Sequence, residues 1–174
     1  MFRKRKEPIR QIIEAIAVFT SGSVRKLRQT TRAQALLDLT ARYQSSEMFD
    51  AMTALRAWER EHGAEFAHRF EDALSKKDEK ALQLNRYRRI VTHYFHNVIM
   101  LYRLKVIDEQ AVKTVVFPFQ VDFLLEVIEP LERTGVGYND IRYMFDAYRQ
   151  IYSLPPYSPS VRDVRWWLWP TSRT

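Results

Sequence analysis

The fold is decided by residues 78–104, which read DEKALQLNRYRRIVTHYFHNVIMLYRL. Large apolar side chains recur there at helical spacing and would cover more than half of the circumference of one long helix. We expect this helix to begin near Asp78 and to end near Leu104. A helix with so little polar surface belongs at the centre of a core. Its apolar positions are Leu82, Tyr87, Ile90, Val91, Tyr94, Phe95, Val98, Ile99, Leu101 and Tyr102.

Helical spacing also dominates the residues that precede this stretch. Thr31 can cap a helix that ends near Tyr43, and Ser45-Ser46 form the start signal of another that runs to about Glu61. Gly63 marks a break, after which the spacing predicts a shorter helix.

The residues after the long helix give three further signals. Asp108 is the expected cap of the next helix, and Pro118 interrupts or kinks its apolar pattern. The pattern then resumes to Glu132, a glycine-containing loop follows, and Asn139 is the expected cap of a last helix ending near Ile151. The apolar positions after the proline are Phe119, Phe123, Leu124, Val127, Ile128 and Leu131.

Together these patterns predict an all-α protein with three parts. Residues 1–7 form a basic N-terminal segment, residues 8–152 a single bundle-like domain of six or seven helices, and residues 153–174 an extended Pro/Trp-rich C-terminal tail. No stretch approaches the roughly 20 apolar residues of a membrane span. The chain has no Cys, which excludes disulfides and thiolate ligands and fits a reducing, cytoplasmic compartment.

The positive charge of the chain lies at its two ends. Residues 1–32 contain nine Lys or Arg and two Glu, and residues 155–174 contain three Arg and one Asp. The remaining 122 residues hold 16 basic and 18 acidic side chains, so the net charge of +7 belongs to the ends. Such a distribution favours an anionic partner without predicting a catalytic site.

Two groups of residues at these ends are the candidate interaction sites. The basic group could bind an anionic membrane together with the apolar face of the helix expected over 9–20, although that face could also pack on the body. The tryptophans could be interfacial anchors, stacking platforms for single-stranded nucleic acid, or side chains that dock in a groove. The candidate residues are Arg3, Lys4, Arg5, Lys6, Arg10, Arg162, Arg165, Trp166, Trp167 and Trp169.

Side chains inside the helical body give weaker functional signals. His93 and His96 share a helix face, but no third ligand stands at useful spacing, so we predict no metal site and no cofactor. No recognisable catalytic frame or phosphate-binding loop is present. Arg86, Arg88 and Arg89 could contact an anion, but pairing of at least one of them with an acid on a neighbouring helix is favoured.

Four short stretches resemble DUF4760, a bacterial helical family of unknown function. They are Ala41–Met48 (ARYQSSEM), Arg89–Asn97, Val106–Glu109 (VIDE) and Ile128–Leu131 (IEPL), and the resemblance covers about half of the chain. It implies an all-α domain and an association with the membrane, and it implies no known activity.

The leading interpretation is a non-enzymatic interaction or accessory module that is peripheral to the inner membrane surface. One alternative is a nucleic-acid-binding protein that uses the basic N-terminus, and another is an enzyme with an unrecognised site. A protein partner or an anionic membrane surface is expected, and self-association into a homo-oligomer stays open.

Overall fold

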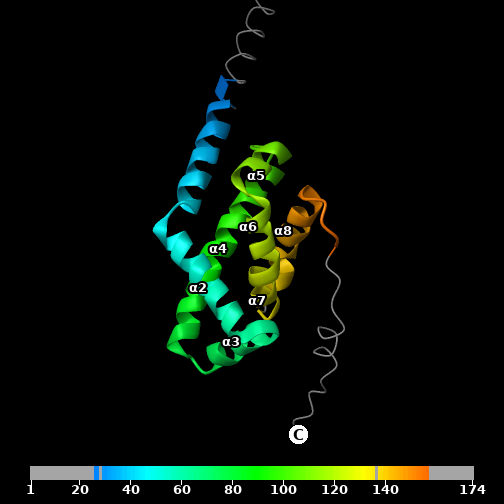
Figure 1. Cartoon of the computed structure of the whole chain (residues 1–174). Helices are drawn as coiled ribbons and strands as arrows, with labels where there is room; N and C mark the ends of the chain where they lie inside the picture. Colours follow the sequence, from blue (N-terminus) through cyan, green and yellow to red (C-terminus); the bar gives the residue numbers. More distant parts are fainter. Residues whose placement is uncertain (1–25, 28, 136, 157–174) are drawn as a thin grey trace, which may run out of the picture.

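The structure is a computed structural model that describes residues 26–27, 29–135 and 137–156 (Figure 1). These residues form helices and turns and include no strand, which confirms the predicted all-α fold. The basic N-terminal segment, the helix expected over 9–20 and the Trp-containing residues after Pro156 lie outside the described residues. In the described part, no helix is both long enough and apolar enough to cross a membrane.

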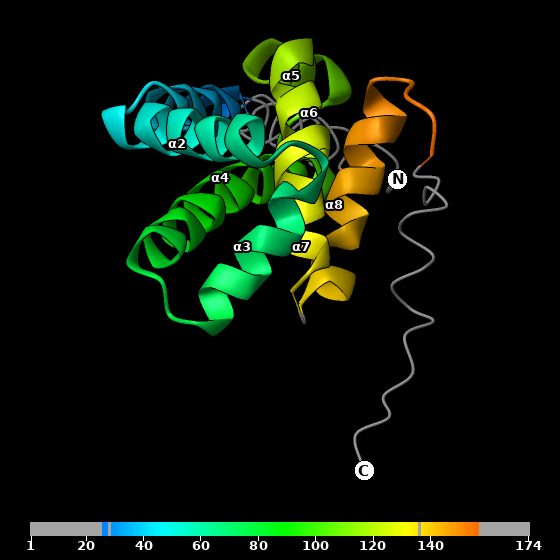
Figure 2. The same ribbon diagram turned by 60° about the horizontal axis from the view of Figure 1, so that its bottom comes forward.

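Helix α4 (Glu79–Arg103) is the element around which the others pack. It contacts α2 (Ser46–His62), α3 (Phe66–Ser75), α5 (Glu109–Val115) and α8 (Tyr138–Ile151). Figures 1 and 2 show it lying between α2 and α8. Residues 78–104 therefore contain the predicted central helix, and its ends lie within one residue of the predicted ones.

The buried positions of α4 follow the predicted spacing with one clear exception. Leu82 is 49% exposed, because it shares a helix face with Arg86, Arg89 and His93, all of which are exposed. That face is in contact with solvent, so the apolar character of one residue does not bury it. The buried residues are Ala81, Leu84, Val91, Thr92, Tyr94, Phe95, Val98 and Ile99.

Short polar side chains start several helices where the sequence places them. Ser45 caps α2 by accepting from Met48 N at 3.2 Å, and Asp78 caps α4 by accepting from Ala81 N at 2.9 Å. Gly63 ends α2 with φ of 55°, a conformation that favours glycine. Thr31 is not a cap, because the helix over residues 29–43 already includes it.

The segment after α4 is divided by Pro118 as predicted. Asp108 caps α5 by accepting from Ala111 N at 2.8 Å, and this bond, with Arg32, holds the pKa of Asp108 below its usual value. Phe117 is extended because a proline follows it, and α6 (Pro118–Phe123) then begins. A π-helical turn (Leu124–Ile128) joins α6 to α7 (Glu129–Arg133).

The last helix begins earlier than predicted. Gly137 precedes the first residue of α8, and no side chain caps this end of the helix. Asn139 lies inside the first turn, so its predicted role as the cap is wrong. The Asp140 N–H instead donates to the Gly137 carbonyl at 3.1 Å, which closes the turn by backbone bonding alone.

Three tyrosine hydroxyls join helices across the core. Tyr94 donates to the Val115 carbonyl at 3.2 Å, Tyr148 donates to the Phe95 carbonyl at 3.1 Å, and Tyr152 donates to the Val116 carbonyl. The carbonyls at the end of α5 lack partners within their own helix, so two of these bonds satisfy a helix C-terminus.

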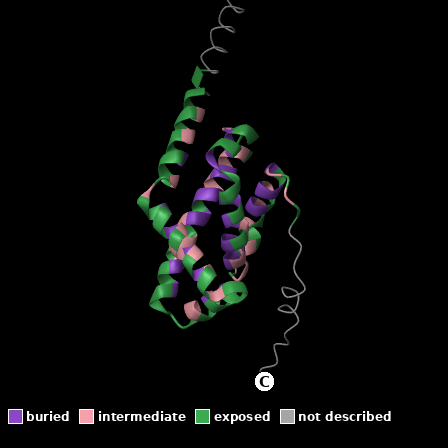
Figure 3. Cartoon of the chain, in the orientation of Figure 1, coloured by how far each residue is buried: buried purple, intermediate pink, exposed green. Residues whose placement is uncertain are grey.

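The helix over residues 29–43 is only partly packed on the body. Figures 1 and 3 show it leading away from the other helices with mostly exposed residues. Leu39 is its one buried residue among those described, and Arg32 pairs with Asp108 at 2.8 Å. This helix therefore holds residue 26 away from the core.

The Phe95→Ala variant is expected to lose roughly 3–5 kcal/mol of unfolding free energy. Phe95 is fully buried and packs edge-on against Tyr94 and Tyr148, so its removal leaves a cavity at the centre of the core. Chemical denaturation measures the loss. A midpoint equal to that of wild type would contradict the central role of α4.

Alkaline titration should reveal a group of late-ionising tyrosines among the nine in the chain. Burial raises the pKa of Tyr152 to about 12 and raises the pKa of Tyr94, Tyr138 and Tyr148 further. A raised pKa stabilises the fold below about pH 10, and that contribution is lost as the pH rises from there through the folded pKa. Tyrosinate absorbance should therefore show a late step that coincides with unfolding. Four tyrosines that ionise near pH 10 in the folded protein would contradict this.

Candidate functional site

Two buried carboxylates on α7 are the most unusual groups of the core. Glu129 and Glu132 are both buried, although Glu is rarely buried without a partner. They stand three residues apart and so lie near each other on one side of the helix.

The π-helical turn explains why both acids face inward. Pro130 has no N–H, and in a regular α-helix its ring would clash with the carbonyl four residues earlier. The chain widens just before it, and Glu129 N–H donates to the Leu124 carbonyl, five residues back. Val127, Ile128 and Glu129 are buried in succession across this turn.

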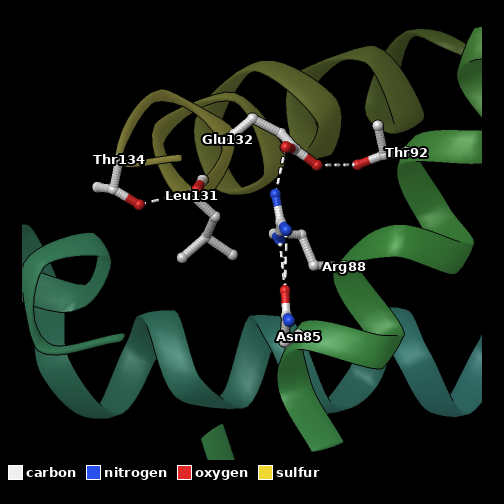
Figure 4. Close-up of polar contacts among 6 residues, drawn as sticks. All are labelled: Asn85, Arg88, Thr92, Leu131, Glu132 and Thr134. Atoms are coloured by element: carbon white, nitrogen blue, oxygen red, sulfur yellow. Dashed lines mark hydrogen bonds and ion pairs between the residues drawn. The ribbon is translucent and has the colours of Figure 1, made fainter. Parts of the chain in front are cut away.

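Glu132 is held by α4 (Figure 4). Arg88 Nη1 donates to its Oε2, and Thr92 Oγ1 donates to its Oε1 at 2.5 Å. Arg88 also donates through Nε and Nη2 to Asn85 Oδ1 at 3.1 and 2.8 Å. Both oxygens of the carboxylate are thus occupied, and the guanidinium is fixed between Asn85 and Glu132.

Glu129 is held by α8 in the same manner. Arg149 Nη1 donates to Oε1 at 3.2 Å, and Arg149 Nη2 donates to Oε2. Tyr138 donates its hydroxyl to Oε1 at 2.8 Å, and burial, together with this carboxylate, raises the pKa of Tyr138. The two acids therefore connect α7 to α4 and to α8, and this bonding supports a structural role for both.

The arginines on α4 confirm the prediction that at least one of them pairs with an acid on a neighbouring helix. Arg88 pairs with Glu132 on α7, and Arg86 lies 3.5 Å from Glu47 on α2. Arg89 is exposed on the same side of α4 as Arg86, next to a shallow hollow of about 410 Å³.

The two histidines on α4 have different surroundings. His93 is exposed, whereas His96 is half-buried with its Nε2 at 2.5 Å from the Tyr143 hydroxyl. Among the residues that the structure describes, no three His, Asp or Glu side chains are grouped closely enough to hold a metal ion.

A larger apolar groove, of about 570 Å³, lies between the surfaces of α2 and α4. The small residues Ala54 and Ala57 leave this space open, and Trp58 lines it. Lys80 spans its rim, where it pairs with Glu61 at 2.9 Å and lies over the Trp58 ring. The Lys80 ammonium holds the pKa of Glu61 below its usual value.

The predicted interaction residues lie outside the described residues. Arg3, Lys4, Arg5, Lys6 and Arg10 precede them. The tail residues that follow are Arg162, Arg165, Trp166, Trp167 and Trp169.

Comparison of the chain with protein-family models, with curated proteins and with solved structures finds no match. The resemblance to the DUF4760 family stays a prediction, and the charges and surfaces of this chain carry the functional argument.

Sequence reasoning missed the buried acids and Arg149. One signal could have indicated Glu132, because it follows Ile128 at inward helical spacing in an otherwise apolar series. Pro130, which directly follows Glu129, was a second signal, since a proline inside a helix disturbs the regular spacing.

The Arg88→Met variant is expected to lose about 3–5 kcal/mol of unfolding free energy, because Glu132 would remain buried without its counter-charge. Replacing both residues, in Arg88→Met with Glu132→Met, should recover most of this loss. Arg86→Met is the matched control, and it should cost less than about 1 kcal/mol because that pair is exposed. Equal losses in the Arg88→Met single variant and in the double variant, measured by urea denaturation, would contradict the coupling.

Proposed function

We propose that the chain is a non-enzymatic interaction module whose helical body is held at an anionic membrane surface by the basic residues that precede residue 26. The observation that supports this is the partition of charge. The described residues contain 18 basic and 18 acidic side chains, so the whole net charge of +7 lies outside them. A neutral body gives no general attraction to anions, and binding then depends on the attached segments.

The helix over residues 29–43 suits this role. It leads from the body toward residue 26, and its attachment through Leu39 and the Arg32–Asp108 pair fixes its direction (Figure 1). Leu37 is exposed on this helix, and Leu27, which precedes it, is exposed as well. Residue 26, which follows the basic residues in the sequence, thus lies away from the core.

The end of the body that carries α5 offers side chains suited to the same surface. Leu104 is 65% exposed in the turn between α4 and α5, with Lys105 beside it. At an anionic membrane, the apolar side chain could enter the lipid while the cation meets the headgroups. The helix over residues 29–43 is paired to this end through Asp108, the cap of α5.

The buried acids support a structural rather than a catalytic role for the core. Glu129 and Glu132 already accept from arginine and from a hydroxyl, so neither carboxylate is a free base in this arrangement. The proposed activity is therefore assigned to surfaces and not to the core.

Vesicle binding tests this function. Replacing Arg3, Lys4, Arg5 and Lys6 by Gln should weaken binding to vesicles of phosphatidylcholine and phosphatidylserine at least about 100-fold, since each cation contributes about 1 kcal/mol near such a surface. A matched control replaces four exposed cations of the body by Gln, and it should change binding less than about threefold. These control residues are Arg42, Arg60, Lys76 and Lys77.

Two results would contradict the proposal. One is equal vesicle binding by the two variants. The other is tight binding of the wild-type chain to duplex or single-stranded DNA with no binding to anionic vesicles, which would support the nucleic-acid alternative.

A further inference from the structure

Two phenylalanines form an exposed stack where α5 meets α6. The rings of Phe117 and Phe119 lie with centroids 6.0 Å apart and planes 6° from parallel, and the residues are 51% and 60% exposed. Phe119 was predicted to face inward with the rest of the apolar pattern of α6, and this prediction is wrong. We name Phe117 and Phe119 the aromatic corner.

The backbone fixes the aromatic corner in place. Pro118 holds Phe117 extended and starts α6, so the two rings stand side by side across the proline. Gln120 Oε1 accepts from Phe117 N at 2.5 Å, and Val121 N donates to the Phe117 carbonyl at 3.2 Å. The backbone of the aromatic corner is therefore preorganised, so a ligand does not have to order it on binding.

The described chain ends close to this surface. The Tyr152 hydroxyl donates to the carbonyl of Val116, the residue before Phe117. Leu154 is half-buried against the core, and its N–H donates to the Arg149 carbonyl at 2.8 Å. The chain thus reaches residues 155 and 156 directly after a segment that contacts the residue before Phe117.

The segment that follows has the length and the chemistry to cover the corner. Trp166 stands ten positions after Pro156, a reach of up to about 35 Å when the chain is extended. Trp166, Trp167 and Trp169 can stack on phenylalanine, and aromatic pairs add stabilisation beyond their buried area.

The charge beside the corner also matches. Asp122 is exposed and stands three residues after Phe119, so it lies on the same side of α6. Arg165 directly precedes Trp166. A tryptophan on the aromatic corner would bring this arginine near the Asp122 carboxylate.

We propose that the segment over residues 157–174 docks on the aromatic corner of the same chain, with tryptophan stacked on Phe117 and Phe119 and Arg165 paired with Asp122. This contact is independent of the proposed membrane attachment, which uses the other basic segment. It would cover an apolar surface that otherwise favours self-association.

Quenching of tryptophan emission by acrylamide tests the contact in the full chain. Trp58 is the one tryptophan in the described residues and is only 6% exposed. Quenching therefore reports mainly on the three tryptophans of residues 157–174. The double variant Phe117→Ser with Phe119→Ser should raise the quenching constant at least about twofold, by the loss of aromatic stacking. The control Leu82→Ser removes an exposed apolar residue at the far end of α4 and should change nothing.

A charge-reversal series tests the pairing without touching the aromatic rings. Asp122→Lys and Arg165→Glu should each raise the quenching constant, and the combination of both should restore the wild-type value. This series also keeps the proposal testable if the double phenylalanine variant folds poorly.

Three outcomes would overturn the proposal. The first is quenching that is unchanged in both the phenylalanine variant and the charge-reversal variants. The second is quenching in the wild-type chain that falls as protein concentration rises, with a matching rise in mass by light scattering, because the occupant would then be a second copy. The third is wild-type tryptophans that are protected only when anionic vesicles are added, because lipid would then be the occupant.

Discussion

The burial of α4 is the constraint on which the rest of the structure depends. A helix of 25 residues is about 37 Å long, and the buried side chains of α4 extend from Ala81 to Ile99. One neighbouring helix cannot cover that length and width of apolar surface. Helices α2, α3, α5 and α8 therefore all contact it. The connections between these helices join elements that lie against the same central helix.

The buried ion pairs fix what apolar packing leaves free. Apolar contact is non-directional, so α7 could slide or rotate against α4 at little cost. The Glu132–Arg88 and Glu129–Arg149 pairs set one register, because any shift would leave a charge buried without its partner. The π-helical turn before Pro130 makes both pairs possible, since it sets the rotation of α7 and so brings Glu129 and Glu132 together into the core.

Local signals predicted the fold well and the buried pairs poorly. The caps Ser45, Asp78 and Asp108 act through bonds three residues away, so the sequence indicates them directly. Arg88 and Glu132 are 44 residues apart, and no periodicity indicates which acid a given arginine will meet. Phe119 was mispredicted for a related reason: its spacing is apolar, but the residues of α6 that face the core directly after it are Gln120 and Val121.

The helical body and the segments attached to it differ in net charge. The ion pairs of the body act over a few ångströms and leave it without net charge, so they contribute little to attraction at a distance. The Debye length at physiological salt is about 8 Å, and only charges that come this close to an anionic surface are attracted to it strongly. In the proposed function, the charges that precede the helix over residues 29–43 make this approach, and the described residues, which have no net charge, contribute little to the attraction. Under this proposal, different residues supply recognition and folding, so the two can vary independently.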